Sequence, residues 1–218
     1  MTYTHDLQAL IDSLSPINPS DYGSSDIRCI KDVFFDALSA HPRVLAIRCR
    51  LTVPQEHIHT RKKNSFQIQE KLLIQFIYEF KDELATDQRI KREQRRRTHG
   101  SDVFYFWRTN RNAAGNIYYD LFIMVNKDEY HKVSDYEGTD LSAMIIRAWA
   151  SVIRLSAKES YEYVFFSKRY KLSSKRENFI GQLQCAFDRV CSMLQRNEPT
   201  HWSNVCHFGS SQYHLAHQ

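Results

Sequence analysis

The segment from Arg43 to Val53, RVLAIRCRLTV, alternates strictly between two sets of side chains. The odd-numbered set after Arg43 is apolar: Leu45, Ile47, Cys49, Leu51 and Val53. The even-numbered set is mixed: Val44, Ala46, Arg48, Arg50 and Thr52. Because successive side chains of a strand point to opposite faces, this segment predicts a strand with one apolar face and one face that carries two arginines.

The remaining periodic segments follow in an order that predicts the fold. Strand-like segments lie at 103–109, 117–125 and 161–167, with a hairpin turn between the first two. Apolar residues at helical spacing predict helices over 66–84 and 141–152, and over 174–194 with a capping box from Ser174 to Glu177. The order strand, helix, strand, strand, helix, strand predicts an α+β fold: a ferredoxin-like βαββαβ antiparallel sheet with additional N-terminal and C-terminal helices.

The chain divides into three expected parts. Residues 1–41 form an N-terminal helical extension, 42–198 the α+β domain, and 199–218 a C-terminal tail. No apolar run reaches 18 residues, and the first residues lack a basic and then apolar leader, so we expect a cytoplasmic protein with no membrane partner. The five cysteines show no metal-binding spacing and are expected to be reduced thiols.

The sheet face opposite the two crossover helices is expected to be open. Alternation places five notable residues there: Arg48, Arg50, Tyr118, Asp120 and Phe122. An open sheet of this kind suits single-stranded nucleic acid, because bases stack on aromatic rings while arginines contact phosphates. The alternative is that an added terminal helix covers this face.

A basic run, RIKREQRRR, follows the first long helix. Its cations are Arg89, Lys91, Arg92, Arg95, Arg96 and Arg97, in a chain of net charge +5. Local basic density of this kind is typical of a polyanion partner. The alternative is a solvated helix end, where basic residues complement the helix dipole.

Several motifs together resemble a known family. They are HPRVLAIRCRLTVPQ, YYDLFIMVNKDEYH, LSAMIIRAWASVI, YVFFSKRYKL and HFGSSQ, in this order between His41 and Gln212. This series resembles the YagK/YfjJ, or inovirus Gp2-type, family of filamentous phages, prophages and integrated elements. That family in turn resembles the HUH rolling-circle replication initiators, which nick DNA.

The resemblance implies a nicking site whose main residues this chain has replaced. In the family, two histidines one residue apart hold a divalent metal that polarises the scissile phosphate, and a helix tyrosine attacks it. Here the histidine positions are Tyr118 and Asp120, while Ser192 and Gln195 stand where the family has tyrosine and lysine. We therefore expect no catalytic residues and no cofactor.

The sequence is compatible with three functional hypotheses. The first is a phage, prophage or satellite-element protein that binds single-stranded or hairpin DNA without nicking it. The second is a protein-interaction module that acts on host or rival-phage machinery. The third is a residual nuclease in which His57, His59 and Asp120 hold Mg²⁺ or Mn²⁺ and Tyr163 or Tyr170 replaces the nucleophile.

Overall fold

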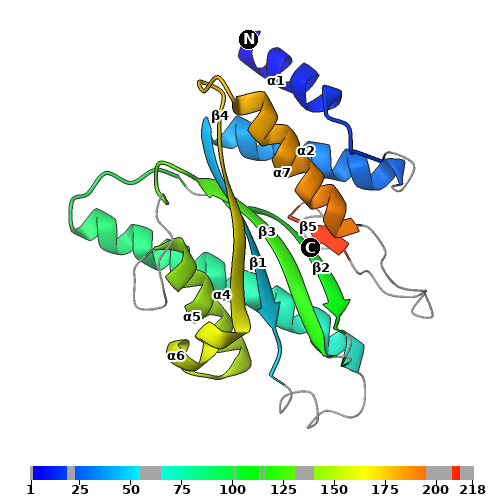
Figure 1. Ribbon diagram of the computed structural model, residues 1–218. Coiled ribbons are helices and arrows are strands. Elements are labelled where there is room, and N and C mark those ends of the chain that lie inside the picture. Colours follow the sequence, from blue (N-terminus) through cyan, green and yellow to red (C-terminus); the bar gives the residue numbers. More distant parts are fainter. Residues whose placement is uncertain are drawn as a thin grey trace.

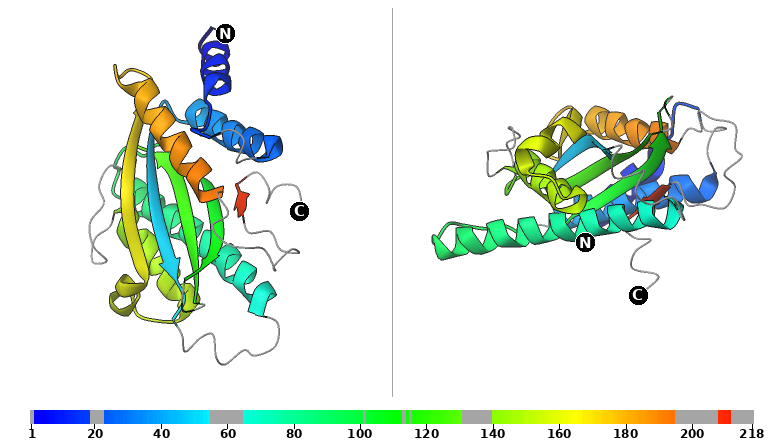
Figure 2. Two further views of the ribbon diagram at one scale, coloured as in Figure 1. Left: turned by 45° about the vertical axis from the view of Figure 1, so that its right-hand side comes forward. Right: turned by 90° about the horizontal axis from the view of Figure 1, so that it is seen from below.

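The computed structural model describes residues 2–18, 23–54, 65–100, 102–112, 114, 116–130, 140–194 and 208–211. A single twisted sheet lies between two groups of helices (Figure 1). Seen from below, the long helix α4 and the helix α7 lie on opposite sides of this sheet (Figure 2). The α+β class predicted from the sequence is confirmed. Within the described ranges, no helix is long and apolar enough to cross a bilayer.

The sheet has five strands in the order β4-β1-β3-β2-β5, and every neighbouring pair is antiparallel. The strands are β1 (Arg43–Thr52), β2 (Phe104–Arg111), β3 (Ile117–Asn126), β4 (Val164–Ser173) and β5 (Phe208–Ser210). Helix α4 (Ser65–Glu93) connects β1 to β2, and α5 (Leu141–Ile153) lies between β3 and β4. The first four strands and these two helices follow the chain order that the sequence predicts for a βαββαβ unit.

Helices α4 and α5 cover one face of the sheet and form the first core. The apolar set of β1 lies in this core, together with Tyr119, Leu121 and Ile123 of β3. Trp149 of α5 is fully buried, and its Nε1 donates a hydrogen bond to the Thr52 carbonyl over 3.0 Å. Asp140 caps α5, because its Oδ1 accepts from the backbone N–H groups of residues 142 and 143.

Helices α1 (Thr2–Ser13), α2 (Ser24–Ala40) and α7 (Phe179–Leu194) form a second core on the other face. Val44 and Ala46 of β1 and Phe122 of β3 are fully buried there. The prediction of an open face is therefore wrong for the end of the sheet where β1 begins, and the alternative of covering terminal helices holds there. The reason is that α2 and α7 each have an apolar stripe that excludes water by packing on these strands.

Two local features differ from the sequence prediction. The predicted capping box of Ser174 and Glu177 does not mark the start of α7, because residues 174–178 form turns and a bend and α7 begins only at Phe179. The closing motif HFGSSQ contributes β5, which adds a short strand to the free edge of β2. A Cβ atom on Gly209 would lie 2.6 Å from the Trp107 indole, so this close approach of β5 requires glycine.

Candidate nucleic-acid interface

One row of side chains runs across the sheet next to the second core. In the strand register, Arg50 lies opposite Asp120, and Asp120 lies opposite Arg108. The row continues to Phe165 of β4 and Phe208 of β5. Since directly opposed residues of antiparallel strands share a face, all five belong to the face on which α2 and α7 pack. The predicted placement of Arg48, Arg50, Tyr118 and Asp120 on this face is confirmed by the same register.

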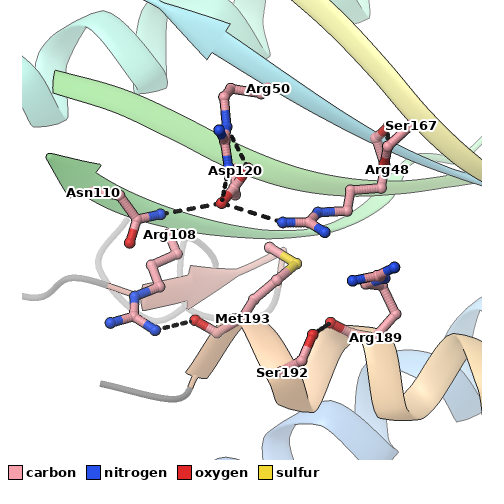
Figure 3. A network of polar contacts seen from close by, with 9 residues as sticks. All are labelled: Arg48, Arg50, Arg108, Asn110, Asp120, Ser167, Arg189, Ser192 and Met193. Carbon is pink, nitrogen blue, oxygen red and sulfur yellow. Dashed lines mark hydrogen bonds and ion pairs between the residues drawn. The ribbon is translucent and has the colours of Figure 1, made fainter. Parts of the chain in front are cut away.

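Asp120 is the centre of a polar network (Figure 3). Its carboxylate accepts from Arg50 Nε at 3.0 Å and Nη2 at 3.3 Å, and from Asn110 Nδ2 at 3.3 Å. Arg48 Nη2 lies 3.4 Å from its Oδ2. Asp120 is only 6% exposed, so this carboxylate serves as a buried counter-ion for two arginines. Its predicted alternative role as a metal ligand would require these donors to be displaced.

Arg50 is held from two sides and remains accessible. Its guanidinium carbon lies 4.1 Å from the centroid of the Tyr118 ring, a cation–π contact, while Asp120 fixes the other side of the group. The Arg50 side chain is 42% exposed, and that of Arg48 is 19% exposed. Arg50 is thus preorganised, with part of its surface still open to a ligand.

The C-terminal end of α7 faces this network (Figure 3). Arg108 donates a hydrogen bond to the Met193 carbonyl, which ties α7 to β2. Ser192 Oγ donates to the Arg189 carbonyl over 2.7 Å, so its hydroxyl is engaged within the helix. The fold therefore brings Ser192 to the same region as Asp120. We name the set Arg48, Arg50, Arg108, Asp120 and Arg189 the arginine site.

Phe122 was predicted to stack on bases, and the structure places it elsewhere. It is fully buried, and its ring lies 6.1 Å from that of Phe34 and 5.8 Å from that of Tyr170. It belongs to the second core, because helix α2 covers its position. The exposed aromatic residue beside the site is Phe165, which is 55% exposed and was not predicted. The same alternation within β4, which places it opposite Arg50, could have identified it.

The basic run lies at the end of α4, on the other face of the sheet from the arginine site. Most of its cations are exposed: Arg89, Arg92, Arg95, Arg96 and Arg97. Lys91 is different, because its Nζ lies 2.6 Å from Asp87 and 2.7 Å from Glu129, and it also contacts the Tyr130 ring. The run and the arginine site are therefore two separate basic surfaces, and Lys91 belongs to an ion-pair network.

Three predicted positions, His57, His59 and Gln195, lie outside the described residues. Among the residues that are described, no group of three or more His, Cys, Asp or Glu side chains could hold a metal ion. Burial raises the pKa of the Cys49 thiol and of the Tyr119 hydroxyl, so neither group favours the ionised form of a nucleophile.

Residues 16–211 match the family model of the YagK/YfjJ C-terminal domain. The chain belongs to the YagK/YfjJ family. It is 25% identical over 179 residues to the uncharacterized protein YagK of Escherichia coli (strain K12), covering 80% of this chain and 86% of YagK. It is 26% identical over 176 residues to the uncharacterized protein YfjJ of the same strain, covering 76% of this chain and 83% of YfjJ. No solved structure matches it.

Proposed function

We propose that this YagK/YfjJ-family protein binds single-stranded or hairpin DNA at the arginine site and does not nick it. It would do so in the cytoplasm of a cell that carries a phage, prophage or satellite element. The observation that carries the proposal is the pairing of two arginines, Arg48 and Arg50, with the one buried carboxylate of Asp120, with Arg108 and Arg189 from β2 and α7 in the same region.

The arginines are suited to phosphate groups. A guanidinium presents several N–H donors in a planar fork, which matches two phosphate oxygens and gives a charge-assisted contact. Asp120 and Tyr118 already hold Arg50 in place, so little side-chain entropy is lost when it binds. Asp120 thus acts through the arginines, by positioning them.

Aromatic side chains beside the arginines could receive bases. Phe165 lies directly opposite Arg50 in the sheet and is exposed, and half-buried Tyr118 lies under the Arg50 guanidinium. Base stacking on such rings contributes about 1–3 kcal/mol per base and tolerates any sequence. Phosphate contacts with adjacent stacking favour a single strand or an unpaired loop over a regular duplex.

The replaced residues explain why binding would not lead to nicking. The family resemblance places metal ligands at Tyr118 and Asp120, and here an ion-pair network with two arginines fills that position. Arginines neutralise a phosphate, but they supply no nucleophile. The Ser192 hydroxyl is hydrogen-bonded within α7 and has no basic partner among the described residues.

Binding is tested by fluorescence anisotropy with a labelled 20-nucleotide single strand and a labelled hairpin. We expect binding that weakens steeply as the salt concentration rises. The salt slope is the slope of the logarithm of the binding constant against the logarithm of the salt concentration. The variant Arg48→Gln/Arg50→Gln should lower the magnitude of this slope by about 0.7 for each lost phosphate contact. The matched control, Arg154→Gln/Lys158→Gln, removes two exposed charges at the turn between α5 and the short helix α6 (Ala157–Ser160) and should leave binding unchanged. Negligible affinity at about 50 mM salt would refute the proposal.

Nicking is tested separately. The protein is incubated with labelled single-stranded DNA and Mn²⁺, and the products are separated under denaturing conditions. We expect intact DNA and no protein–DNA adduct. A covalent adduct would show that a relocated nucleophile is active.

A further inference from the structure

Asn110 of β2 belongs to the Asp120 network but adds no charge to it. In the strand register it lies opposite Tyr118 of β3, so both residues are on the face that carries the arginine site. Its Nδ2 donates to Asp120 Oδ2 over 3.3 Å, and Arg50 Nη2 donates to the same oxygen, also over 3.3 Å. One carboxylate oxygen therefore holds the Asn110 amide next to the Arg50 guanidinium.

The chemistry of Asp120 decides which way the Asn110 amide points. A carboxylate paired with arginines is ionised and can only accept hydrogen bonds, so the NH2 end of the amide must face it. The other end of the amide, Oδ1, then points away from Asp120, as Figure 3 shows. Arginine side chains only donate. Asn110 thus adds to the arginine site a hydrogen-bond acceptor whose orientation is fixed.

Beside this acceptor, Arg50 offers a flat surface. One face of its guanidinium lies on the Tyr118 ring, and the edge formed by Nε and Nη2 is turned to Asp120. The Arg50 side chain is nevertheless 42% exposed, which leaves the other face of the guanidinium accessible. Unpaired bases stack on guanidinium planes as they do on aromatic rings. A base stacked on Arg50 would have its edge near the Asn110 amide.

We infer that one unpaired base stacks on the accessible face of Arg50 and donates from its exocyclic amino group to Asn110 Oδ1. Cytosine and adenine carry such an amino group, whereas thymine has a carbonyl oxygen in its place. The one N–H donor of thymine lies between two carbonyl oxygens, which Oδ1 would repel. The site therefore favours cytosine or adenine over thymine. This inference rests on the proposed function, because it names the bases that the arginine site selects.

The first arm of the test compares the wild-type protein on strands of different bases. Fluorescence anisotropy at about 50 mM salt gives the Kd for 20-nucleotide strands of cytosine only and of thymine only. One added hydrogen bond should make the cytosine strand bind about two- to tenfold more tightly. A strand of 2-pyrimidinone, which is cytosine without its amino group, should bind like the thymine strand.

The second arm assigns the preference to Asn110. Asn110→Ala should bring the two Kd values close together. Loss of the contact with Asp120 in this variant weakens binding of both strands alike, so the ratio of the Kd values, and not the affinity, is the readout. Asn178→Ala removes an exposed amide in the turn before α7 and should keep the wild-type ratio. Arg50→Lys keeps the charge but removes the flat surface, so it should also reduce the preference.

The outcomes separate this inference from the proposed function. Equal affinity of the wild type for the cytosine and thymine strands would overturn the inference and leave the proposed function standing. A cytosine preference that persists in Asn110→Ala would also overturn it, because another group would then read the base. Negligible binding of every strand would refute the proposed function and this inference together.

Discussion

The two faces of the sheet are formed by the same strands, but helices cover them to different extents. Toward α4 and α5, β1 presents apolar side chains from Leu45 onward and β3 presents them from Ile117 to Val125, and the helices bury them. Toward α2 and α7, β1 is apolar only at Val44 and Ala46 and then carries Arg48 and Arg50. The second core ends where these charges begin, because burying them without partners would cost more than the helices gain.

The largest expected change in stability distinguishes a residue at the buried end of the second face from one at its exposed end. Phe122→Ala should lower the free energy of unfolding by about 3–5 kcal/mol, since it removes a fully buried ring from between α2 and the sheet. Phe165→Ala, at the exposed end, should change it by no more than about 0.5 kcal/mol. Urea unfolding of both variants measures the difference, and a larger cost for Phe165→Ala would contradict this view of the face.

The second prediction concerns the edge that β5 adds to the sheet. Gly209→Ala should destabilise the protein by about 1–3 kcal/mol, because the new methyl group would overlap the Trp107 indole. Gly100→Ala is the matched control, since a Cβ there meets no atom within 4 Å. Thermal unfolding should show a loss for the first variant and almost none for the second. Equal stability of the two would mean that β5 does not pack as described.

A smaller difference is expected between the stability costs of breaking two ion pairs. Asp120→Asn should cost about 1–3 kcal/mol, because it leaves two partly buried arginines without their counter-ion. Asp128→Asn breaks the pair with Arg43, whose side chains are 44% and 32% exposed, and should cost less than about 1 kcal/mol. Chemical unfolding at neutral pH gives both values. The reverse order would remove Asp120 from the centre of the arginine site.

The smallest expected effect concerns the α4 side of the sheet and depends on pH. Burial alone would raise the pKa of Glu129, but hydrogen bonds from Lys91 and from the His99 N–H outweigh it and lower the pKa below the ordinary 4.5. The folded state therefore binds this proton less readily than the unfolded state. Its stabilising contribution is present above pH 4.5 and is lost as the pH falls through the lowered pKa.

Glu129→Gln should accordingly lower the free energy of unfolding by about 1 kcal/mol at pH 7. It should also make the decrease of this free energy toward acidic pH less steep. Unfolding measured between neutral and acidic pH tests this. Glu177→Gln, at an exposed position, serves as the control and should leave the profile unchanged. An equally steep loss of stability toward acidic pH in Glu129→Gln would contradict this stabilising role of the Glu129 carboxylate.

The sequence predicted the order of the elements because each long segment carries its own period. Alternation in β1 and β3 also assigned each side chain to the correct face. It could not show whether a helix lies above a given residue, and for this reason Phe122 was placed on an open surface. The charged residue Arg48 in β1 was the sequence feature that could have indicated where the covering helices end.

Other features depend on contacts between distant segments. Arg108 and Arg189 reach the arginine site from β2 and α7, and no local pattern connects them. Strand β5 has only three residues, too few for a recognisable period. Ser174 and Glu177 have the spacing of a capping box. The chain makes turns directly after β4, however, and the helix starts later than the local sequence pattern predicts.

The proposed function requires that the arginine-bearing end of the second face contacts DNA. Ultraviolet cross-linking of a single strand that contains 5-bromodeoxyuridine, followed by peptide mapping, tests it directly. We expect cross-links at Phe165 or Tyr118, beside Arg50. Tyr78 provides an internal control, because it is 62% exposed on α4, on the other side of the sheet. Cross-links at Tyr78 without any at Phe165 or Tyr118 would contradict the claim.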